Sequence, residues 1–275
     1  HDGIIVLPSN TEVGIPASSI YDVYNDVIFE IGLTPNRSDA HSHIGVARDL
    51  LAAYNFRYKK DGILKITDYK IDNATDNKHN FKINVDNKED CFKYFGVTID
   101  NITVGESPQW LKNRLTAIGQ KSINNIVDVT NYVLHEYGQP LHAFDLEACI
   151  GNEIIVKNVA ANTVFKTLDN QDVKLLASDL MICNAQNPMC IAGVYGGLDS
   201  GVKSTTKAIF LESAYFNPKS IRKTSTAHQL RTEAAVHFEK GIDPDFTEKA
   251  LHRAVELLML IDNQIKVTSH VFKIE

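Results

Sequence analysis

The first predicted element comes from an alternation of apolar and other residues over positions 27–33, where every second residue is large and apolar. This period of two predicts a short strand. Residues 34–36 (Thr-Pro-Asn) end it, and Ser38 or Asp39 would cap a following helix that has apolar residues at helical spacing. Residues 1–58 are therefore predicted to form one small α/β unit.

Lysine, aspartate and asparagine dominate the next segment, in which apolar residues are sparse. We predict that residues 59–89 are a linker with two short edge strands, at 64–66 and 81–85. Polar segments of this kind bury little surface, so the linker is expected to separate two folded parts of the chain.

Two helices follow a strand predicted at residues 91–99. The first helix begins at residues 107–108 (Ser-Pro) and ends at Gly119, which places proline at the start and glycine just past the end. One of the two asparagines at 124–125 caps the second helix, which stops before Gly138.

The chain is rich in predicted strands beyond residue 140. Short apolar runs bounded by turn residues predict strands at 153–159, 164–168, 173–175, 180–183, 189–195 and 208–211, with a hairpin turn at 169–170 (Asp-Asn). Three helices follow, and they begin at residues 217–218, 232 and 243–244. Because strands and helices do not alternate strictly, the predicted fold class is α+β, with mixed sheets and packed helices.

Composition indicates a folded protein, and net charge limits its partners. The 275 residues are 44% hydrophobic and 23% charged, which is typical of globular proteins and excludes intrinsic disorder. No run approaches the ~20 consecutive apolar residues of a membrane helix, and no secretory signal is visible at the N-terminus. The net charge of −6 argues against nonspecific coating of nucleic acid.

One basic segment, residues 219–240, contrasts with this acidic balance. Its cations outnumber its carboxylates. The cations are Lys219, Arg222, Lys223, Arg231 and Lys240, and the carboxylates are Glu233 and Glu239. Such a patch either contacts phosphate or is a solvated surface, and charge alone leaves both interpretations open.

Potential metal ligands do not follow the usual spacings. The four cysteines (Cys91, Cys149, Cys183 and Cys190) include no Cys-x-x-Cys pair, whereas zinc ligands are usually closely paired. We predict reduced, mostly buried thiols in a cytosolic protein. The histidines at positions 41 and 43 would lie roughly 200° apart on a helix, so they do not share a face. No metal site is predicted.

The sequence contains no P-loop, dinucleotide-binding glycine motif, nucleophile elbow or zinc-protease helix. Its one Gly-rich turn spans residues 192–197 and is either a tight loop or a backbone cradle for a ligand. His142 lies in a turn-like run after a predicted helix. A lone histidine in that place is either structural or part of a site.

Three longer motifs follow one another along the chain. They are Leu-Thr-Pro-Asn-Arg-Ser-Asp at 33–39 with 45–48, Ser-Pro-Gln-Trp-Leu at 107–111 with 123–133 and 138–145, and Phe-Leu-Glu-Ser-Ala at 210–214 with 230–235 and 238–243. In this order they resemble the β subunit of phenylalanyl-tRNA synthetases of the bacterial, heterotetrameric kind, over nearly the whole chain. One departure is His237, where that family usually has arginine.

The resemblance implies that residues 1–58 close the first domain of such a subunit and that residues 90–275 form its editing module, the third and fourth domains. The chain would then be a cytoplasmic fragment, without a membrane partner, that binds tRNA(Phe) and assembles with the α subunit in an α2β2 enzyme. Activation of phenylalanine with ATP and Mg would need the α subunit and further domains, and the fragment itself would need no cofactor.

The resemblance also implies that this chain hydrolyses mischarged Tyr-tRNA(Phe). Tyrosine exceeds phenylalanine by one hydroxyl, which an apolar pocket rejects only about 10²-fold, whereas a pocket that hydrogen-bonds a hydroxyl rejects the analogue lacking it by ~10⁴–10⁵. Glu212, between apolar neighbours at a predicted strand end, is implied as the residue that reads the hydroxyl. The other interpretation is a structural carboxylate paired with a cation.

His142 is implied as the second catalytic residue, which positions the terminal adenosine or the attacking water. A general-base role stays open, because an imidazole pKa of ~6.5 permits it. The implied substrate-binding residues are Thr130, Asn131, Pro140, Gly196, Thr232 and Ala234.

Two other functions fit the same sequence. A noncatalytic module that positions RNA would bind the acceptor end without deacylating it. A subunit-assembly domain would expose a large apolar patch and tolerate changes at Glu212.

Overall fold

The computed structural model describes residues 4–21, 24–71 and 77–275. The chain divides into two compact units, residues 1–30 and 31–275. The described residues of the first unit form the 3-10 turn η1 (Ala17–Ser19) and no strand. The strand predicted at 27–33 is wrong: the segment pairs with no described strand, and Val27 and Phe29 are 73% and 79% exposed. Alternation alone does not stabilise a strand that lacks neighbours.

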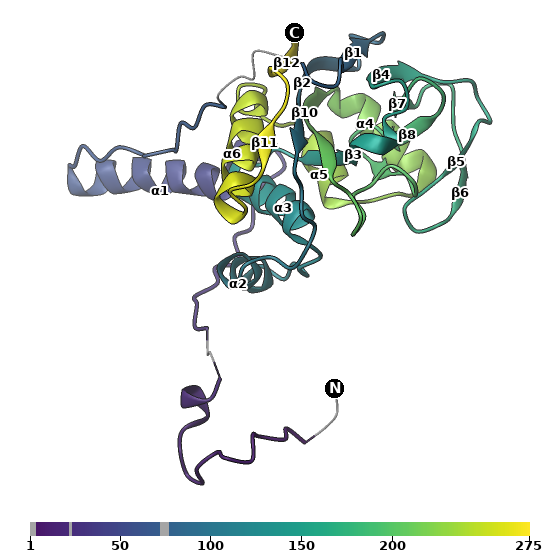
Figure 1. Cartoon of the computed structure of the whole chain (residues 1–275). Coiled ribbons are helices and arrows are strands. Elements are labelled where there is room, and N and C mark those ends of the chain that lie inside the picture. The colour runs from purple at the N-terminus through teal and green to yellow at the C-terminus, as the bar shows by residue number, and fades with distance from the viewer. Residues whose placement is uncertain (1–3, 22–23, 72–76) are drawn as a thin grey trace. The chain divides into compact units, whose positions relative to one another are not determined.

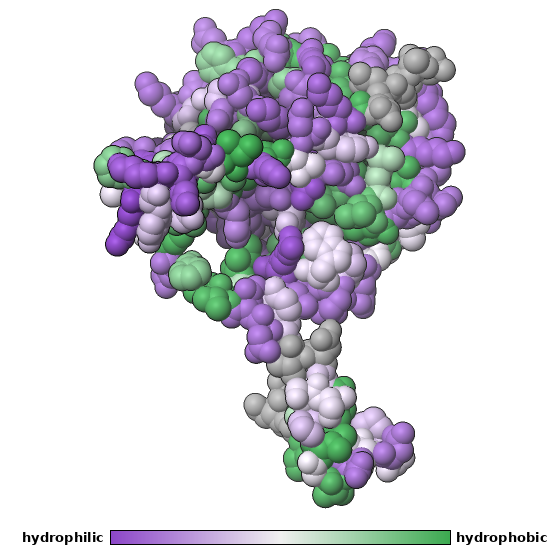
Figure 2. Space-filling view, turned by 90° about the vertical axis from the view of Figure 1, so that its left-hand side faces the viewer, coloured by the Kyte–Doolittle hydropathy of each residue, from purple (hydrophilic) through white to green (hydrophobic). Residues whose placement is uncertain are grey.

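The helix predicted from Ser38 or Asp39 begins later. A 3-10 turn, η2 (Ser38–Ala40), precedes helix α1 (His43–Tyr58), and the Ser42 hydroxyl accepts the first-turn N–H of Gly45 at 3.0 Å. Helix α1 projects on the side that faces the viewer in Figure 2, where apolar and polar side chains are interspersed. Its exposed apolar residues are Leu50, Tyr54, Phe56 and Tyr58.

The central sheet of the second unit has the strand order β11-β2-β10-β3, and β12 also pairs with β2 (Figure 1). The longest strands, β2 and β10, are antiparallel neighbours, and β3 is antiparallel to β10. The strands are β2 (Cys91–Asp100), β3 (Leu141–Asp145), β10 (Ala208–Phe216), β11 (Lys266–Val267) and β12 (Phe272–Ile274).

A second sheet has the order β1-β4-β7-β8-β9, with β1 parallel to β4 at one edge. Its strands are β1 (Lys82–Val85), β4 (Glu153–Asn158), β7 (Leu180–Cys183), β8 (Pro188–Ile191) and β9 (Tyr195–Gly196), and a separate hairpin joins β5 (Val164–Lys166) to β6 (Asp172–Lys174). The edge strand predicted at 81–85 is thus confirmed, as is the hairpin turn at 169–170. The strand predicted at 64–66 is wrong.

Three helices begin where their sequence signals predict. Asn124 accepts the N–H groups of Ile126 and Val127, Asn217 accepts that of Lys219, and Thr232 accepts that of Ala235. The helix predicted from residues 243–244 begins only at Phe246, and the one predicted from 107–108 begins at Gln109; neither has a side-chain cap. The helices are α2 (Gln109–Ala117), α3 (Asn125–Tyr137), α4 (Pro218–His228), α5 (Glu233–Lys240) and α6 (Phe246–Ile261), with the 3-10 turn η3 (Leu146–Ala148). The α+β fold class is confirmed.

Alternation along β2, β10 and β3 sends side chains into two separate cores. Ile209 and Leu211 belong to a core that includes buried residues of α3 and α6, whereas Phe210 and Phe144 belong to a core that includes the second sheet, α4 and α5. In Figure 1, α2, α3 and α6 accordingly lie on one side of the central sheet, and the second sheet with α4 and α5 lies on the other. Glu212, two residues from Phe210, points into the second of these cores.

Two predictions near the site need correction. Residues 141–145, predicted as turn-like, form strand β3, and the strand predicted at 208–211 continues to Phe216, so Glu212 lies inside it and not at its end. The polar pair Glu212-Ser213 interrupts the apolar run of β10, which hides its length. Both side chains are nevertheless buried, because β10 is a central strand.

Gly96→Ala is expected to destabilise the fold by about 2 kcal/mol. A Cβ at Gly96 would lie 2.1 Å from Cζ of Phe210, whose ring lies across the glycine in the core. Urea unfolding measures the change, and Gly105→Ala, where a Cβ meets nothing within 4 Å, is the matched control. Equal midpoints for the two variants would contradict the close approach.

Candidate functional site

The two predicted catalytic residues are cross-strand neighbours. Glu212 of β10 lies directly opposite His142 of β3, and Gly96 of β2 lies opposite Glu212 on its other side. Side chains of directly opposed residues point to the same face, with Cβ atoms roughly 4.5–5.5 Å apart. The carboxyl and the imidazole therefore share one face of the central sheet, and the ring of Phe210 fills the space over the glycine.

Glu212 is buried, with 5% of its surface exposed. The hydroxyl of Tyr94 donates a hydrogen bond to its Oε2 at 2.6 Å, and Oε1 has no hydrogen-bond partner within the described part of the chain. Burial raises the pKa of Glu212 to about 8, although the Tyr94 hydrogen bond opposes that shift. At neutral pH the group is therefore mainly a neutral acid, and its proton belongs on Oε1 because Oε2 already accepts from Tyr94.

The interpretation of Glu212 as a structural carboxylate paired with a cation finds no support. Among the residues that the structure describes, no lysine, arginine or histidine forms an ion pair with it. A carboxyl that is buried without a cation costs free energy, so its retention in a core strand calls for a role other than stability.

His142 is half-buried, and its ring packs edge-on against Phe144 with centroids 4.4 Å apart. Its Nε2 is buried without a hydrogen-bond partner in the described residues. Burial lowers the pKa of His142 to about 4, so the ring is neutral at pH 7. A buried ring nitrogen without a partner costs free energy unless a water or ligand completes it.

Gly196 lies beside this histidine. A Cβ at Gly196 would be 3.5 Å from Cε1 of His142, so a larger residue would reduce the space next to the ring. The Gly-rich turn is held from the opposite side by Thr232, whose hydroxyl donates to the carbonyl of Val194 at 2.9 Å and caps α5. Gly193 has a φ of +65° and packs against three core side chains, which makes it a tight-turn residue.

The other predicted substrate-binding residues lie on α3, on α5 and just before β3. Ala234 is half-buried in the first turn of α5, and Pro140 is buried immediately before β3. Thr130 is buried in α3 and donates its hydroxyl to the Val127 carbonyl at 2.7 Å, and Asn131 beside it is half-buried. Neither Thr130 nor Asn131 hydrogen-bonds Glu212 or His142 in the structure.

Two buried residues that hold the site together were not predicted. Tyr94 supplies the phenol that binds Glu212, and Gln139 donates to the carbonyls of Pro140 and Ala214, 2.9 Å each, which ties the start of β3 to β10. Tyr94 lies 118 residues from Glu212 in the sequence, so no local signal connects them. For Gln139, the sequence signal is only a polar residue before a proline, which does not predict that its side chain joins β3 to β10.

His237, the departure from the family pattern, stacks on His41 with centroids 4.1 Å apart and planes 7° apart. Burial lowers the pKa of His237 to about 3, which leaves it neutral and unable to form an ion pair at pH 7. Within the described residues, no three His, Cys, Asp or Glu side chains are grouped so that they could hold a metal ion. The four cysteines are free and buried, and burial raises the pKa of each thiol.

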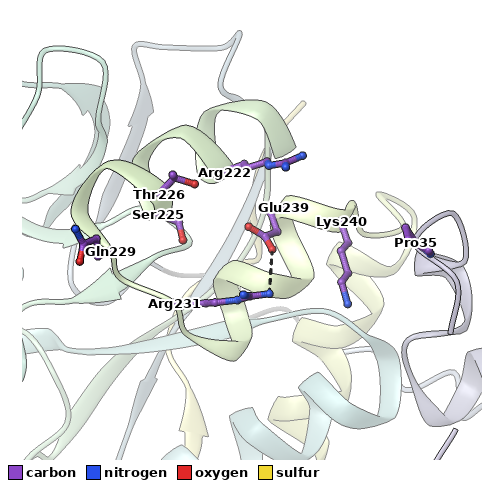
Figure 3. Close-up of a pocket in the computed structure, with 8 residues that line it drawn as sticks. All are labelled: Pro35, Arg222, Ser225, Thr226, Gln229, Arg231, Glu239 and Lys240. Atoms are coloured by element: carbon purple, nitrogen blue, oxygen red, sulfur yellow. Dashed lines mark ion pairs between the residues drawn. The ribbon is translucent and has the colours of Figure 1, made fainter. Parts of the chain in front are cut away.

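A pocket of about 640 Å³ lies against α4 and α5, and none of the predicted site residues lines it. It is lined by Pro35, Arg222, Ser225, Thr226, Gln229, Arg231, Glu239 and Lys240 (Figure 3). The basic segment predicted from charge therefore borders a real concavity. Among the described residues, no helix combines the length and the apolar character needed to span a membrane.

Residues 90–263 match the B3/4 domain family. The phenylalanine–tRNA ligase β subunit of Porphyromonas gingivalis is 49% identical over 265 residues, which are 95% of this chain and 32% of that protein. The same-named subunit of Bacteroides fragilis is 48% identical over 260 residues, 94% of this chain and 31% of that protein. Among solved structures, an N-terminal fragment of the phenylalanyl-tRNA synthetase β subunit from Pyrococcus horikoshii has a TM-score of 0.48 and 14% identity, covering 88% of this chain and 64% of that one.

The chain spans about a third of the length of the two curated relatives, and the B3/4 match covers most of its second compact unit. The chain therefore belongs to the B3/4 domain family, and its predicted resemblance to phenylalanine–tRNA ligase β subunits is confirmed.

Proposed function

We propose that this chain carries the editing site of a phenylalanine–tRNA ligase and hydrolyses mischarged Tyr-tRNA(Phe). The observation that carries the proposal is a buried, neutral carboxyl, Glu212, directly across a strand pair from an imidazole nitrogen of His142 that lacks a partner. The first group suits recognition of a phenol, and the second suits recognition of water or of the aminoacyl ester.

Recognition of tyrosine depends on the free oxygen of Glu212. Because Oε2 accepts from Tyr94, the protonated Oε1 can donate to the phenol oxygen of a bound tyrosine. A bound phenylalanine would leave that buried O–H unpaired, which costs about 1–3 kcal/mol. The site would thus prefer the amino acid that the synthetic pocket wrongly accepts.

His142 is proposed to position water and not to act as a general base. An imidazole with a pKa of about 4 has little tendency to take a proton at pH 7, but its neutral Nε2 can accept or donate one hydrogen bond, according to tautomer. An aminoacyl ester is already reactive, so fixing the direction of approach of a water suffices to accelerate its hydrolysis.

The remaining parts of the proposed activity lie outside this chain. Activation of phenylalanine with ATP and Mg is assigned to the α subunit and to other domains of an α2β2 enzyme.

The space for the tyrosyl group and the terminal adenosine is proposed to be lined by the remaining predicted residues of this chain, which are Thr130, Asn131, Pro140, Gly196, Thr232 and Ala234.

His142→Ala is expected to slow deacylation of Tyr-tRNA(Phe) by about tenfold, because it removes roughly one hydrogen bond to the attacking water. The assay follows release of labelled tyrosine by the 275-residue chain at saturating RNA. His270→Ala, which removes an exposed histidine, is the matched control. Unchanged turnover in His142→Ala would return that residue to a structural role, and absence of release by the parent chain would reject the editing function.

A subunit-assembly role is the second candidate, favoured by α1. Gly45 is the helix's one buried residue, and Leu50 and Phe56 are 68% and 79% exposed, as expected for a surface that a partner covers. Loss of the preference for Tyr-tRNA(Phe) on Glu212 substitution would separate editing from this alternative, which predicts indifference to Glu212. A noncatalytic RNA-positioning role predicts binding of Tyr-tRNA(Phe) without release of tyrosine.

A further inference from the structure

The basic pocket between α4 and α5 is a cavity that the proposed editing chemistry does not use. Its lining cations come from three places: Arg222 from α4, Arg231 from the loop before α5, and Lys240 from the last turn of α5 (Figure 3). One carboxylate, Glu239, also lines it. Its volume of about 640 Å³ is within the range of ligand-binding pockets.

These cations are poorly neutralised. Arg222 and Lys240 form no ion pair with any described residue. Arg231 reaches Glu239 only at 4.0 Å, and its side chain is 75% exposed. Helix α4 also carries Lys219 and Lys223 but no acidic residue. In a chain of net charge −6, this concentration of unpaired positive charge attracts an anion locally.

The uncharged lining residues add hydrogen-bond donors. The Thr226 hydroxyl and the Gln229 amide are both on exposed residues, and Gln229 is held at a φ of +55° by the C-terminal cap of α4. The guanidinium groups present planar pairs of N–H donors that match phosphate oxygens. A surface rich in donors and cations fits phosphate better than it fits an apolar or a basic ligand.

The pocket is close to the proposed editing site along the chain. Arg231 immediately precedes Thr232, whose hydroxyl holds the Gly-rich turn beside His142. At 1.5 Å per residue, the eight residues of α5 span roughly 12 Å. Arg231 just before this helix and Lys240 at its end are therefore separated by a distance that a few nucleotides of a strand can cover.

We propose that this pocket binds the sugar-phosphate backbone of an RNA strand whose 3′ end enters the site at Glu212 and His142. This inference rests on the proposed editing function for the identity of the strand. The cations lie at separate points on α4, the loop and α5, which suits successive phosphates of one strand. Backbone contacts of this kind position a strand without reading its sequence.

The test measures binding of unacylated tRNA(Phe) to the 275-residue chain by fluorescence anisotropy over a series of KCl concentrations. The double variant Arg222→Gln/Arg231→Gln is expected to bind at least tenfold more weakly, with a salt slope reduced by about one per lost contact. Lys65→Gln/Lys174→Gln removes two exposed cations outside the pocket and is the charge-matched control. Since Arg222 and Arg231 are exposed, both doubles are expected to unfold at the same temperature as the parent.

Equal affinity and slope in the two double variants would overturn the proposal. Displacement of the RNA by millimolar inorganic phosphate at constant ionic strength would also overturn it, because the pocket would then bind a single phosphate and not a strand.

The same measurements keep the two proposals apart. A parent chain that binds RNA through the pocket but releases no tyrosine would reject editing and leave the pocket assignment intact. A parent chain that edits, with pocket variants that bind like the control, would reject the pocket alone.

Discussion

Glu212→Ala is expected to remove the preference for Tyr-tRNA(Phe) over Phe-tRNA(Phe), a loss of selectivity on the order of 10- to 10²-fold. The substitution deletes the carboxyl whose Oε1 is proposed to pair with the phenol, and it leaves the hydroxyl of Tyr94 without its partner. Release of labelled tyrosine and labelled phenylalanine from the two RNAs, measured as kcat/KM, gives the selectivity directly.

Glu212→Gln tests which protonation state of Glu212 recognises the phenol. If the neutral acid reads the phenol, glutamine preserves an acceptor for Tyr94 and a donor for the substrate, so much of the selectivity should remain. If an ionised carboxylate accepts from the phenol, glutamine should lose selectivity as alanine does. Parent selectivity in Glu212→Ala would show that another group recognises the hydroxyl and would end the editing assignment of this residue.

The stability of Glu212→Gln relative to the parent is expected to increase by about 4 kcal/mol between pH 4.5 and pH 8. Burial raises the pKa of Glu212 from 4.5 to about 8, so the folded protein holds a proton that the unfolded chain has lost. The contribution of the neutral acid is therefore complete below pH 4.5 and declines as pH rises through 8. Glutamine does not titrate, so the variant escapes this decline.

Urea unfolding of both proteins at several pH values measures this difference. The curve of the parent must be subtracted because two histidines also change stability with pH. Burial lowers the pKa values of His142 and His237, so their contribution has the opposite sign and the protein loses stability as pH falls below about 6.5. Glu147→Gln removes an exposed carboxyl and is the charge-matched control. A constant difference between Glu212→Gln and the parent across the range would mean that Glu212 is solvated and not buried.

Local sequence signals predicted the helical part of the second unit well. The caps at Asn124, Asn217 and Thr232 accept the first-turn N–H groups as expected, since capping depends on residues within three positions of one another. The local signal for strands failed at residues 27–33 and 64–66. Apolar side chains alternate there, but no described strand lies beside either segment to complete the hydrogen bonds.

What the sequence by itself determined was the family, the fold class and the identity of the candidate side chains, because motifs, periodicity and caps are properties of short segments. Only the tertiary structure decided that His142 lies on a strand opposite Glu212, that Tyr94 occupies one carboxyl oxygen, and that the arginines border a pocket apart from both. Strand register joins segments more than 60 residues apart, and the raised pKa of Glu212 arises from desolvation by the surrounding core. Neither the strand register nor the pKa of Glu212 is determined by any one segment of the chain.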